Sequence, residues 1–416
     1  MIESYVDDIL KKAHESFFEL SKQREDTINT ALESLAELLD KNREKIKKIN
    51  AIDVENAKKN NLKSALIDRL ILNDKRIGGI IDAIEVVKKL KCPVGEVIEG
   101  WRLENGLSIE KVRVPIGTIG IIYESRPNVT IDAAILTLKS LNSAVLKGGS
   151  EAINSNRFLS ELLKEALKQN NLNPDTIGFL DTTDRTAVNI MLKSDKYIDA
   201  IVPRGGEGLV KFVSQNATMP VIKHDKGLCH TYIDKDTDIK KALDIAFNAK
   251  VQRPGVCNAT ETLLVHRAIA EKFLKAFKPL MDKAEVELRG CKKTREIIDV
   301  KEAKEEDWQT EYLDLILSIK VVETTDEAIE HINKYGSKHS EAIVTENYST
   351  AERFLNEVDA SCVYVNASTR FTDGGVFGFG AEIGISTNKL HARGPVGLKE
   401  LTTYKYKIRG DGQIRQ

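Results

Sequence analysis

The sequence predicts an α/β protein with two parallel sheets covered by helices and a small additional β element. Two stretches, from about residue 118 to 223 and from about 239 to 365, alternate short apolar runs with helical segments, as layered parallel sheets require. Ahead of them, about 90 residues show helical periodicity. Because 416 residues are too many for one ordinary core, we expect two or three domains.

The first 90 residues predict a layer of amphipathic helices. Gly and Pro are nearly absent before Gly78, Gly79 and Pro93. Apolar residues recur three and four positions apart and leave Glu and Lys on the other face, as in Ile28, Ala31, Leu32, Leu35, Leu38 and Leu39. We expect this layer to pack against the sheet and to offer little that could hold a ligand.

Residues 97–103 and 107–115 alternate as two strands around Glu104-Asn105-Gly106. An Asn-Gly pair between alternating runs predicts a β-hairpin. The tail, residues 401–408, alternates in the same way and predicts one more strand.

The first α/β stretch is divided as follows. Strands are expected at residues 118–123, 144–147, 177–180, 200–203 and 220–223. Helices are expected near residues 131–141, 151–168, 186–193 and 208–214.

The second α/β stretch begins with a helix at residues 239–248 and a Gly/Pro loop. Strands are expected at residues 260–265, 319–322, 342–345 and 362–365. Helices are expected at residues 268–282, 326–334 and 350–357. The charged segment 286–311 has no clear period, so we assign no element there.

Composition excludes several classes of protein. Lys+Arg 62 against Asp+Glu 63 argues against a broad nucleic-acid surface. The longest apolar runs fall short of a membrane span, and the acidic start is unlike a signal peptide, so we expect a cytoplasmic protein. The five cysteines are scattered without a CxxC pair and no two-carboxylate cluster is evident, so we expect neither disulfides nor a metal.

Cys257 has the most suggestive surroundings of the five cysteines. It follows the Pro254-Gly255 turn and precedes a strand, where a side chain can project into a cleft. A nucleophilic cysteine must reach the thiolate form, which neighbouring cations favour, and Arg253 is close in the sequence. The alternative, a loop cysteine that is simply buried, stays open on these residues alone.

Two glycine turns follow strands of the first sheet and open helices. They are Lys147-Gly148-Gly149-Ser150 and Arg204-Gly205-Gly206. Backbone N–H groups at such turns attract phosphate, and both turns carry a cation. Each could instead be an ordinary capping turn, but two of them at successive strand ends favour a ligand site. Neither turn matches the dinucleotide fingerprint or a P-loop.

Two further segments carry polar groups suited to an anionic substrate. In the strand-to-helix turn at residues 124–130, Asn128 could donate to an oxyanion and Arg126 could hold an anion; helix capping is the alternative. The run 365–386 has five glycines between 374 and 384 and cannot form a regular element. Its Ser368, Arg370 and Thr372, with Arg253, are candidate substrate-binding residues.

In combination, Cys257, Asn128 and Lys147 resemble the aldehyde dehydrogenase superfamily. More narrowly, six strings resemble the branch that reduces γ-glutamyl phosphate: SRPNVT, VLKGGSEA, VPRGGEGLV, QRPGVCNATET, NASTRFTDGGVFGFGAEIGIST and LHARGPVGL. The resemblance implies a cofactor domain (1–96 and 115–227), a catalytic domain (228–400) and an oligomerisation hairpin with tail strand (97–114 and 401–416). It also implies a homo-oligomer.

The resemblance further implies NADPH-dependent reduction of L-glutamate 5-phosphate to L-glutamate 5-semialdehyde and phosphate, in proline biosynthesis. Cys257 would form a thioester, and Asn128 with the Cys257 backbone N–H would hold the oxyanion. Lys147 with Gly148, Gly149 and Ser150 would meet the adenosine ribose or its phosphate, and the Arg204 turn the pyrophosphate. A separate glutamate 5-kinase would supply the substrate.

One departure from the wider superfamily concerns water activation. Where hydrolytic members carry a general-base glutamate, this chain has His224 followed by Asp225. The loss of this glutamate fits an enzyme whose thioester is protected from water. His224 could be a catalytic base or a packed histidine. Two alternatives stay open: an ordinary or CoA-acylating aldehyde dehydrogenase, and a non-catalytic nucleotide-binding module.

Overall fold

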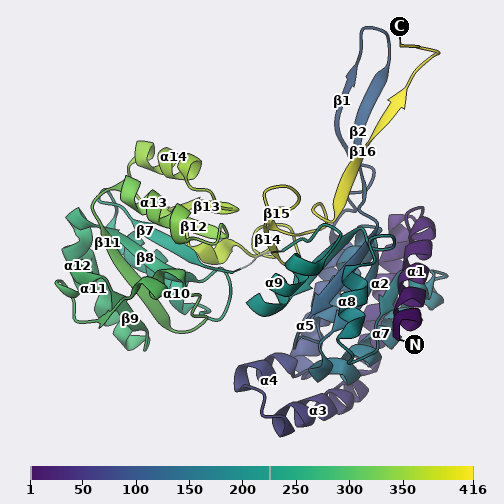
Figure 1. Cartoon of the computed structure of the whole chain (residues 1–416), viewed down its shortest axis with the longest axis horizontal. Coiled ribbons are helices and arrows are strands. Elements are labelled where there is room, and N and C mark those ends of the chain that lie inside the picture. Colours follow the sequence, from purple (N-terminus) through teal and green to yellow (C-terminus); the bar gives the residue numbers. More distant parts are fainter. Residues whose placement is uncertain (1, 224–225, 416) are drawn as a thin grey trace. The chain divides into compact units, whose positions relative to one another are not determined.

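The computed structural model describes residues 2–223 and 226–415, which fall into two compact units (Figure 1). Unit 1 comprises residues 1–223, 379–384 and 396–416, and unit 2 comprises 224–378 and 385–395. The predicted α/β class, with two parallel sheets and a small antiparallel sheet, is confirmed. The boundary falls after residue 223, and two short segments of the expected catalytic domain, 379–384 and 396–400, belong to unit 1.

The N-terminal segment forms the predicted helices. They are α1 (Ile2–Leu20), α2 (Glu25–Lys41), α3 (Arg43–Lys59), α4 (Ser64–Leu70) and α5 (Asp74–Lys89). The expected face of α2 is buried, with Ile28, Leu32 and Leu35 almost inaccessible to solvent. Among the described residues, no helix combines the length and apolar character needed to cross a bilayer.

The parallel sheet of unit 1 has the strand order β5-β4-β3-β6. Its strands are β3 (Thr118–Tyr123), β4 (Ser143–Gly148), β5 (Ile177–Phe179) and β6 (Ala200–Arg204). The strand predicted at residues 220–223 is wrong, because this segment pairs with β6 at a single bridge, Ile201 to Val221. The chain leaves unit 1 directly afterwards, so no ladder can extend.

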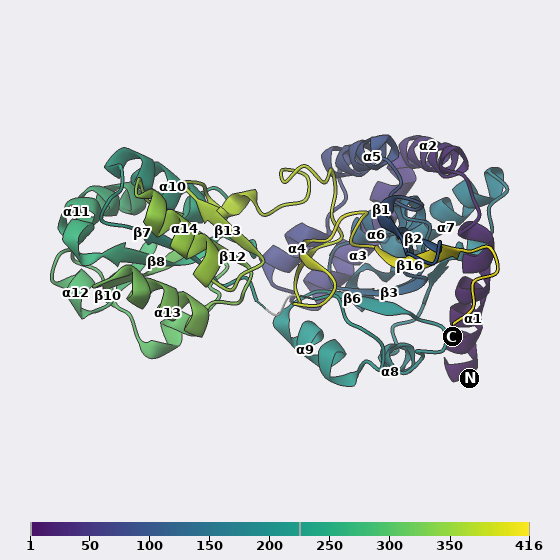
Figure 2. The ribbon, with the colours of Figure 1, turned by 90° about the horizontal axis from the view of Figure 1, so that it is seen from above.

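Helices cover both faces of this sheet (Figure 2). They are α6 (Val129–Lys139), α7 (Ile153–Gln169), α8 (Thr186–Leu192) and α9 (Glu207–Asn216). On one face, Val6 and Leu10 of α1, Met191 of α8 and Val213 of α9 share a core with Ile122 of β3. Helices α6 and α7 lie on the other face, so the sheet is buried on both sides, as its continuous apolar strands require.

A separate three-stranded antiparallel sheet has the order β1-β2-β16. It is formed by β1 (Val97–Arg102), β2 (Ser108–Pro115) and β16 (Thr402–Arg409). Gly106 has φ +93° in the predicted Asn-Gly turn, where a side chain would be strained. The sheet extends away from the helices of unit 1 (Figure 1). The large side chains Trp101, Tyr404 and Tyr406 on this sheet are exposed.

The sheet of unit 2 is parallel throughout, with the order β10-β9-β11-β8-β7-β12-β13. Its strands are β7 (Cys229–Ile233), β8 (Thr260–His266), β9 (Glu287–Gly290), β10 (Lys301–Glu302), β11 (Ile316–Val322), β12 (Ser340–Val344) and β13 (Cys362–Val365). The sequence pattern does not predict β7. Strands β9 and β10 lie in the charged segment 286–311, where charged residues mask the apolar alternation.

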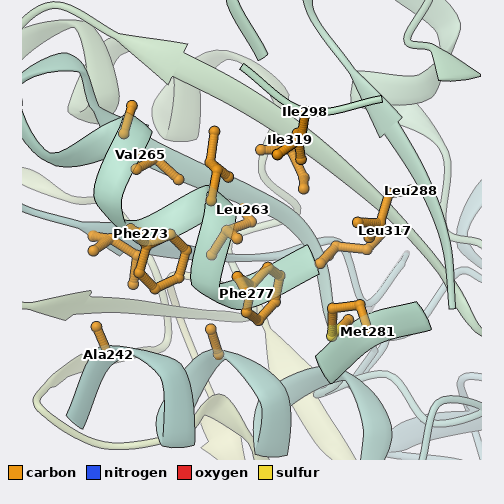
Figure 3. Packing of buried hydrophobic residues seen from close by; sticks show 14 of the residues in the cluster. Ala242, Leu263, Val265, Phe273, Phe277, Met281, Leu288, Ile298, Leu317 and Ile319 are labelled. Atoms are coloured by element: carbon orange, nitrogen blue, oxygen red, sulfur yellow. The ribbon is translucent and has the colours of Figure 1, made fainter. Parts of the chain in front are cut away.

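Helices cover both faces of the second sheet as well. They are α10 (Ile239–Val251), α11 (Arg267–Lys283), α13 (Thr325–Tyr335) and α14 (Tyr348–Glu357), with the short α12 (Lys292–Arg295) beside β9. Figure 3 shows Phe273, Phe277 and Met281 of α11 against Leu263 and Ile319 of the sheet. The glycine-rich run is irregular as predicted, apart from a 3-10 turn and β14 (Ile385–Thr387), which pairs with β15 (Arg393–Pro395).

Candidate active site

Cys257 lies in the loop between α10 and β8 of unit 2 and is partly exposed. Gly227 packs directly on its backbone, since a Cβ at Gly227 would stand 2.0 Å from the Cys257 carbonyl oxygen. The buried Cys229 thiol donates to the same oxygen at 3.2 Å. The Cys257 backbone is therefore held from two sides, while part of the residue stays accessible.

Arg370 brings positive charge to Cys257, and Arg253 is close enough to Arg370 to repel it. The Arg370 Nε donates to Gln252 at 3.0 Å, and its Nη1 donates to the Asn258 side chain. Partial burial lowers the pKa of Arg370 from its ordinary value, and repulsion by Arg253 adds to this, whereas Asp373 and a Cys257 thiolate oppose it. The structure thus brings Arg370, which is more than 100 residues away in the sequence, to the segment that carries Arg253 and the predicted nucleophile.

The hydroxyl groups predicted to bind substrate brace this loop. Ser368 caps the turn that carries Arg370 by accepting from its backbone N–H at 3.3 Å. Thr372 is fully buried, and its hydroxyl accepts from Ser340 at 2.6 Å and lies 2.7 Å from the Tyr364 hydroxyl. The Thr372 hydroxyl thereby has two internal hydrogen-bond partners, and its expected contact with the substrate stays a prediction.

The predicted oxyanion donor, Asn128, stands at the start of α6 in unit 1. The turn before it is strained at Ser125 (φ +42°) and is fixed by Glu151, which accepts from the Ser125 N–H and hydroxyl at 2.5 and 2.6 Å. Asn128 makes no capping hydrogen bond; its amide nitrogen donates to Asp132 at 2.7 Å. Arg126, in the same turn, is partly buried.

A pocket of about 990 Å³ opens in unit 1 at the carboxyl ends of β3 and β4. Its lining includes all four residues of the first predicted cofactor turn: Lys147, Gly148, Gly149 and Ser150. Gly148 has no room for a side chain, since a Cβ there would stand 2.1 Å from the Asn156 amide. Burial lowers the pKa of the Lys147 ammonium, which donates to the Gly148 carbonyl at 2.8 Å, and Glu151 opposes the shift.

The second predicted turn lies beside this pocket without lining it. The Gly206 N–H donates to the Glu124 carboxylate at 2.9 Å, and Glu124 belongs to the lining. Arg204 packs its side chain against Gly384. The pyrophosphate role expected for Arg204, Gly205 and Gly206 therefore stays a prediction, with Glu124 in front of the turn.

The helical layer does more than expected, because α3 and α4 form a wall of the pocket. Asp53, Asn56, Asn60, Leu62 and Leu66 all line it, so the layer that was expected to offer little to a ligand contributes residues to a pocket. Asn56 and Asn60 are four residues apart and share a helical face, a signal that the sequence contained. The fold, and not the local pattern, brings this face to the end of β4.

Arg185 is the functional candidate that the sequence did not suggest. It lines the pocket, is exposed, and makes no ion pair within the part of the chain that the structure describes. His224 and Asp225, in contrast, lie outside the described residues. Over residues 2–223 and 226–415, no three His, Cys, Asp or Glu side chains group as metal ligands.

Comparison with known proteins gives consistent matches over the chain. A model of the aldehyde dehydrogenase family matches residues 2–295 and 290–406. The γ-glutamyl phosphate reductase of a Nitratiruptor species is 59% identical over 412 residues, or 98% of this chain and 99% of that protein. That of Thermotoga maritima is 54% identical over 407 residues, 98% of each chain.

Comparison with solved structures gives matches to the same family. The crystal structure of γ-glutamyl phosphate reductase from Thermotoga maritima has a TM-score of 0.97 and 53% identity, covering 99% of this chain and 100% of that one. An acetylating aldehyde dehydrogenase from Geobacillus thermoglucosidasius, 20% identical, has a TM-score of 0.71 over 100% of this chain and 98% of its own, and shares the fold.

Proposed function

Because this chain belongs to the aldehyde dehydrogenase family, we propose that it reduces L-glutamate 5-phosphate to L-glutamate 5-semialdehyde and phosphate with NADPH, as a step of proline biosynthesis. The observation that carries the proposal is its likeness, at 59% identity over 98% of the chain, to a γ-glutamyl phosphate reductase. The surroundings of Cys257 support it, since a thiol in the field of Arg370, with Arg253 four residues before it in the sequence, suits attack on an anionic acyl phosphate.

The pocket of unit 1 fits a dinucleotide. It is concave and large, it lies at the carboxyl ends of parallel strands, and it presents the Lys147 and Arg185 cations with the close backbone of Gly148. Lys147, Gly148, Gly149, Ser150 and Arg185 would hold the adenosine half of NADPH. The bound cofactor supplies the hydride that reduces the thioester.

In the proposed mechanism, the Cys257 thiolate attacks the acyl carbon, a C–S bond forms and the C–O bond to phosphate breaks. After reduction, the thiohemiacetal oxyanion collapses, expels the Cys257 thiolate and leaves the aldehyde. Asn128 and the Cys257 N–H donate to the oxyanion in both steps. Arg126, Arg253 and Arg370 are proposed to hold the carboxylate and phosphate of the substrate, with Ser368 and Thr372 bracing the Arg370 loop.

The Asn128→Ala variant is expected to fold normally and to lose about 10²–10³ in kcat, the usual cost of one oxyanion donor. The change removes a short, partly buried amide that does not cap its helix, together with its hydrogen bond to Asp132. Steady-state kinetics together with NADPH binding would check this. Full activity would exclude Asn128 from the oxyanion contact.

The Arg185→Ala variant is expected to bind NADPH about 10-fold to 100-fold more weakly and NADH almost unchanged, because a charged hydrogen bond to the 2′-phosphate contributes about 1.5–3 kcal/mol. Fluorescence titration with each cofactor, and calorimetry with 2′,5′-ADP against 5′-ADP, measure this without turnover. Lys193→Ala, an exposed cation just beyond α8, serves as the control. Equal losses for both cofactors would contradict the assignment.

The function itself is tested in the reverse direction, by NADP⁺ reduction with glutamate 5-semialdehyde at varied phosphate. The proposal requires phosphate or arsenate. Oxidation without phosphate would favour an ordinary aldehyde dehydrogenase, and dependence on CoA an acylating one. If the chain is only a nucleotide-binding module, iodoacetamide will not label Cys257 selectively and NADPH will not change the labelling.

We also propose that the protein is cytoplasmic, forms a homo-oligomer and receives its labile substrate from a separate glutamate 5-kinase. The oligomer would use the sheet of β1, β2 and β16, which exposes Val97, Trp101, Tyr404, Tyr406 and Ile408. Exposed aromatic and aliphatic groups gathered on one sheet favour a protein interface.

A further inference from the structure

Asp132 is a carboxylate in a helix whose other residues are all buried and mostly apolar. Around it in α6, Ile131, Ala133, Ala134 and Ile135 are essentially inaccessible to solvent. Asp132 keeps a little accessible surface, but the surrounding protein desolvates it and raises its pKa to about 6. Placing a carboxylate there costs stability, so its contacts need an explanation.

The contact that stands out is the 2.7 Å hydrogen bond from the Asn128 amide nitrogen to Asp132 Oδ2. The two residues are one helical turn apart, so their side chains share a face. A carboxylate can only accept hydrogen bonds, and it therefore fixes which way the amide is turned. One N–H of Asn128 is held by Asp132, and the second N–H of the same nitrogen is left with a defined direction.

The beginning of α6 is rigid, so this direction is preserved. The Tyr123 hydroxyl lies 2.7 Å from the Thr130 hydroxyl, which donates to Asn156 of α7 at 3.1 Å. Arg126, before the helix, and Arg204, at the end of β6, act on Asp132 with positive charge and favour its ionised form. Toward α2, the buried Lys139 of the same helix pairs with Glu25 at 2.7 Å.

From this geometry we propose that Asp132 is a positioning residue, which orients the Asn128 amide so that a N–H, and not the carbonyl oxygen, faces the oxyanion of the reacting acyl group. The inference rests on the proposed function of Asn128. An amide free to turn over would present its oxygen to a negative charge for part of the time and would lose the stabilisation that it provides.

The test is a double-mutant cycle with Asn128→Ala, Asp132→Ala and the combined variant. We expect Asp132→Ala to lower kcat about 10-fold to 100-fold, with a small change in KM, and to have almost no further effect once Asn128 is Ala. If Asp132 only supports the fold, its effect will persist in the Asn128→Ala background, and the inference is overturned. If Asn128→Ala alone has no effect, the proposed oxyanion role fails instead.

The Asp132→Asn variant keeps the shape of the side chain, so it is less prone to misfold than Asp132→Ala. It also allows the dependence of kcat on pH to be compared with that of the unmodified enzyme. Below pH about 6 the Asp132 carboxylate of the unmodified enzyme gains a proton and can no longer enforce the amide orientation, so kcat falls. In Asp132→Asn we expect a kcat lower by about 10-fold at pH 8 and no decline attributable to this group at lower pH. The exposed Asp82→Asn on α5 is the control and should retain both activity and pH profile. An unchanged pH profile in Asp132→Asn would contradict the inference.

Discussion

The Cys257→Ser variant is expected to lose reduction of L-glutamate 5-phosphate by about 10⁴-fold or more while still binding NADPH. A serine hydroxyl is far less acidic than a thiol, and the surrounding arginines can assist only a group that ionises. The proposed cofactor pocket lies wholly in unit 1, whereas Cys257 lies in unit 2, so the substitution leaves the pocket intact. Cofactor fluorescence and steady-state kinetics measure the two properties separately.

Cys291→Ser is the matched control, because Cys291 is a partly exposed cysteine of the same unit that precedes α12. It should keep its activity. Mass spectrometry of the quenched reaction should find an acyl adduct on the peptide that contains Cys257 and on no other cysteine peptide. Turnover of Cys257→Ser within 10-fold of the parent would rule out covalent catalysis by this residue.

The Lys250→Met variant is expected to lower the free energy of unfolding of unit 2 by about 3–5 kcal/mol. Lys250 on α10 and Glu261 on β8 form an ion pair of 2.6 Å, and both side chains are 0% exposed. Burial raises the pKa of Glu261 to about 7 and lowers that of Lys250, so each charge depends on its partner. Removing the lysine leaves a buried carboxyl that still accepts from the Leu313 N–H at 3.1 Å but has lost its counter-charge.

Combining Lys250→Met with Glu261→Leu should restore most of this loss, because no buried charge then remains. The exposed pair Lys275–Glu271 of α11, also 2.6 Å apart, is the control, and Lys275→Met should leave the free energy of unfolding almost unchanged because solvent screens this pair. Trp308 is buried in unit 2, so urea unfolding followed by its fluorescence in a Trp101→Phe background reports this unit. A double variant as unstable as the single one would contradict the argument.

The raised pKa of Glu261 determines how the stability of the Lys250→Met variant changes with pH. Its pKa is raised in the folded state, so the stability linked to its protonated form is present at low pH and is lost as pH rises through about 7. Without Lys250 this carboxyl must stay protonated to remain buried. The loss in the free energy of unfolding caused by Lys250→Met should therefore be larger at pH about 8 than at pH about 5.

Local patterns along the chain account for most of the secondary structure. The strands at residues 118–123 and 362–365 have the predicted ends, because uninterrupted apolar runs bounded by turns leave little choice. The hairpin around Gly106 followed from turn chemistry. Local patterns also explain the two kinds of wrong prediction. Strand β9 was missed because charged residues interrupt its apolar pattern. Residues 220–223 have the composition of a strand but pair with a neighbouring strand at a single bridge.

Periodicity and contiguous motifs were enough to predict the fold class and the family, and they pointed to the residues of greatest chemical interest. Tertiary packing was needed to place α3 and α4 along the pocket, to bring Arg185 to its lining, and to bring Arg370 from a distant part of the chain to the segment of Arg253 and Cys257. Packing also gives the Thr372 hydroxyl its hydrogen bond from Ser340, and gives the Asn128 amide its hydrogen bond to the Asp132 carboxylate. The reason is physical: a motif fixes the chemistry of a segment, whereas packing decides which side chains meet and which polar groups are left to act.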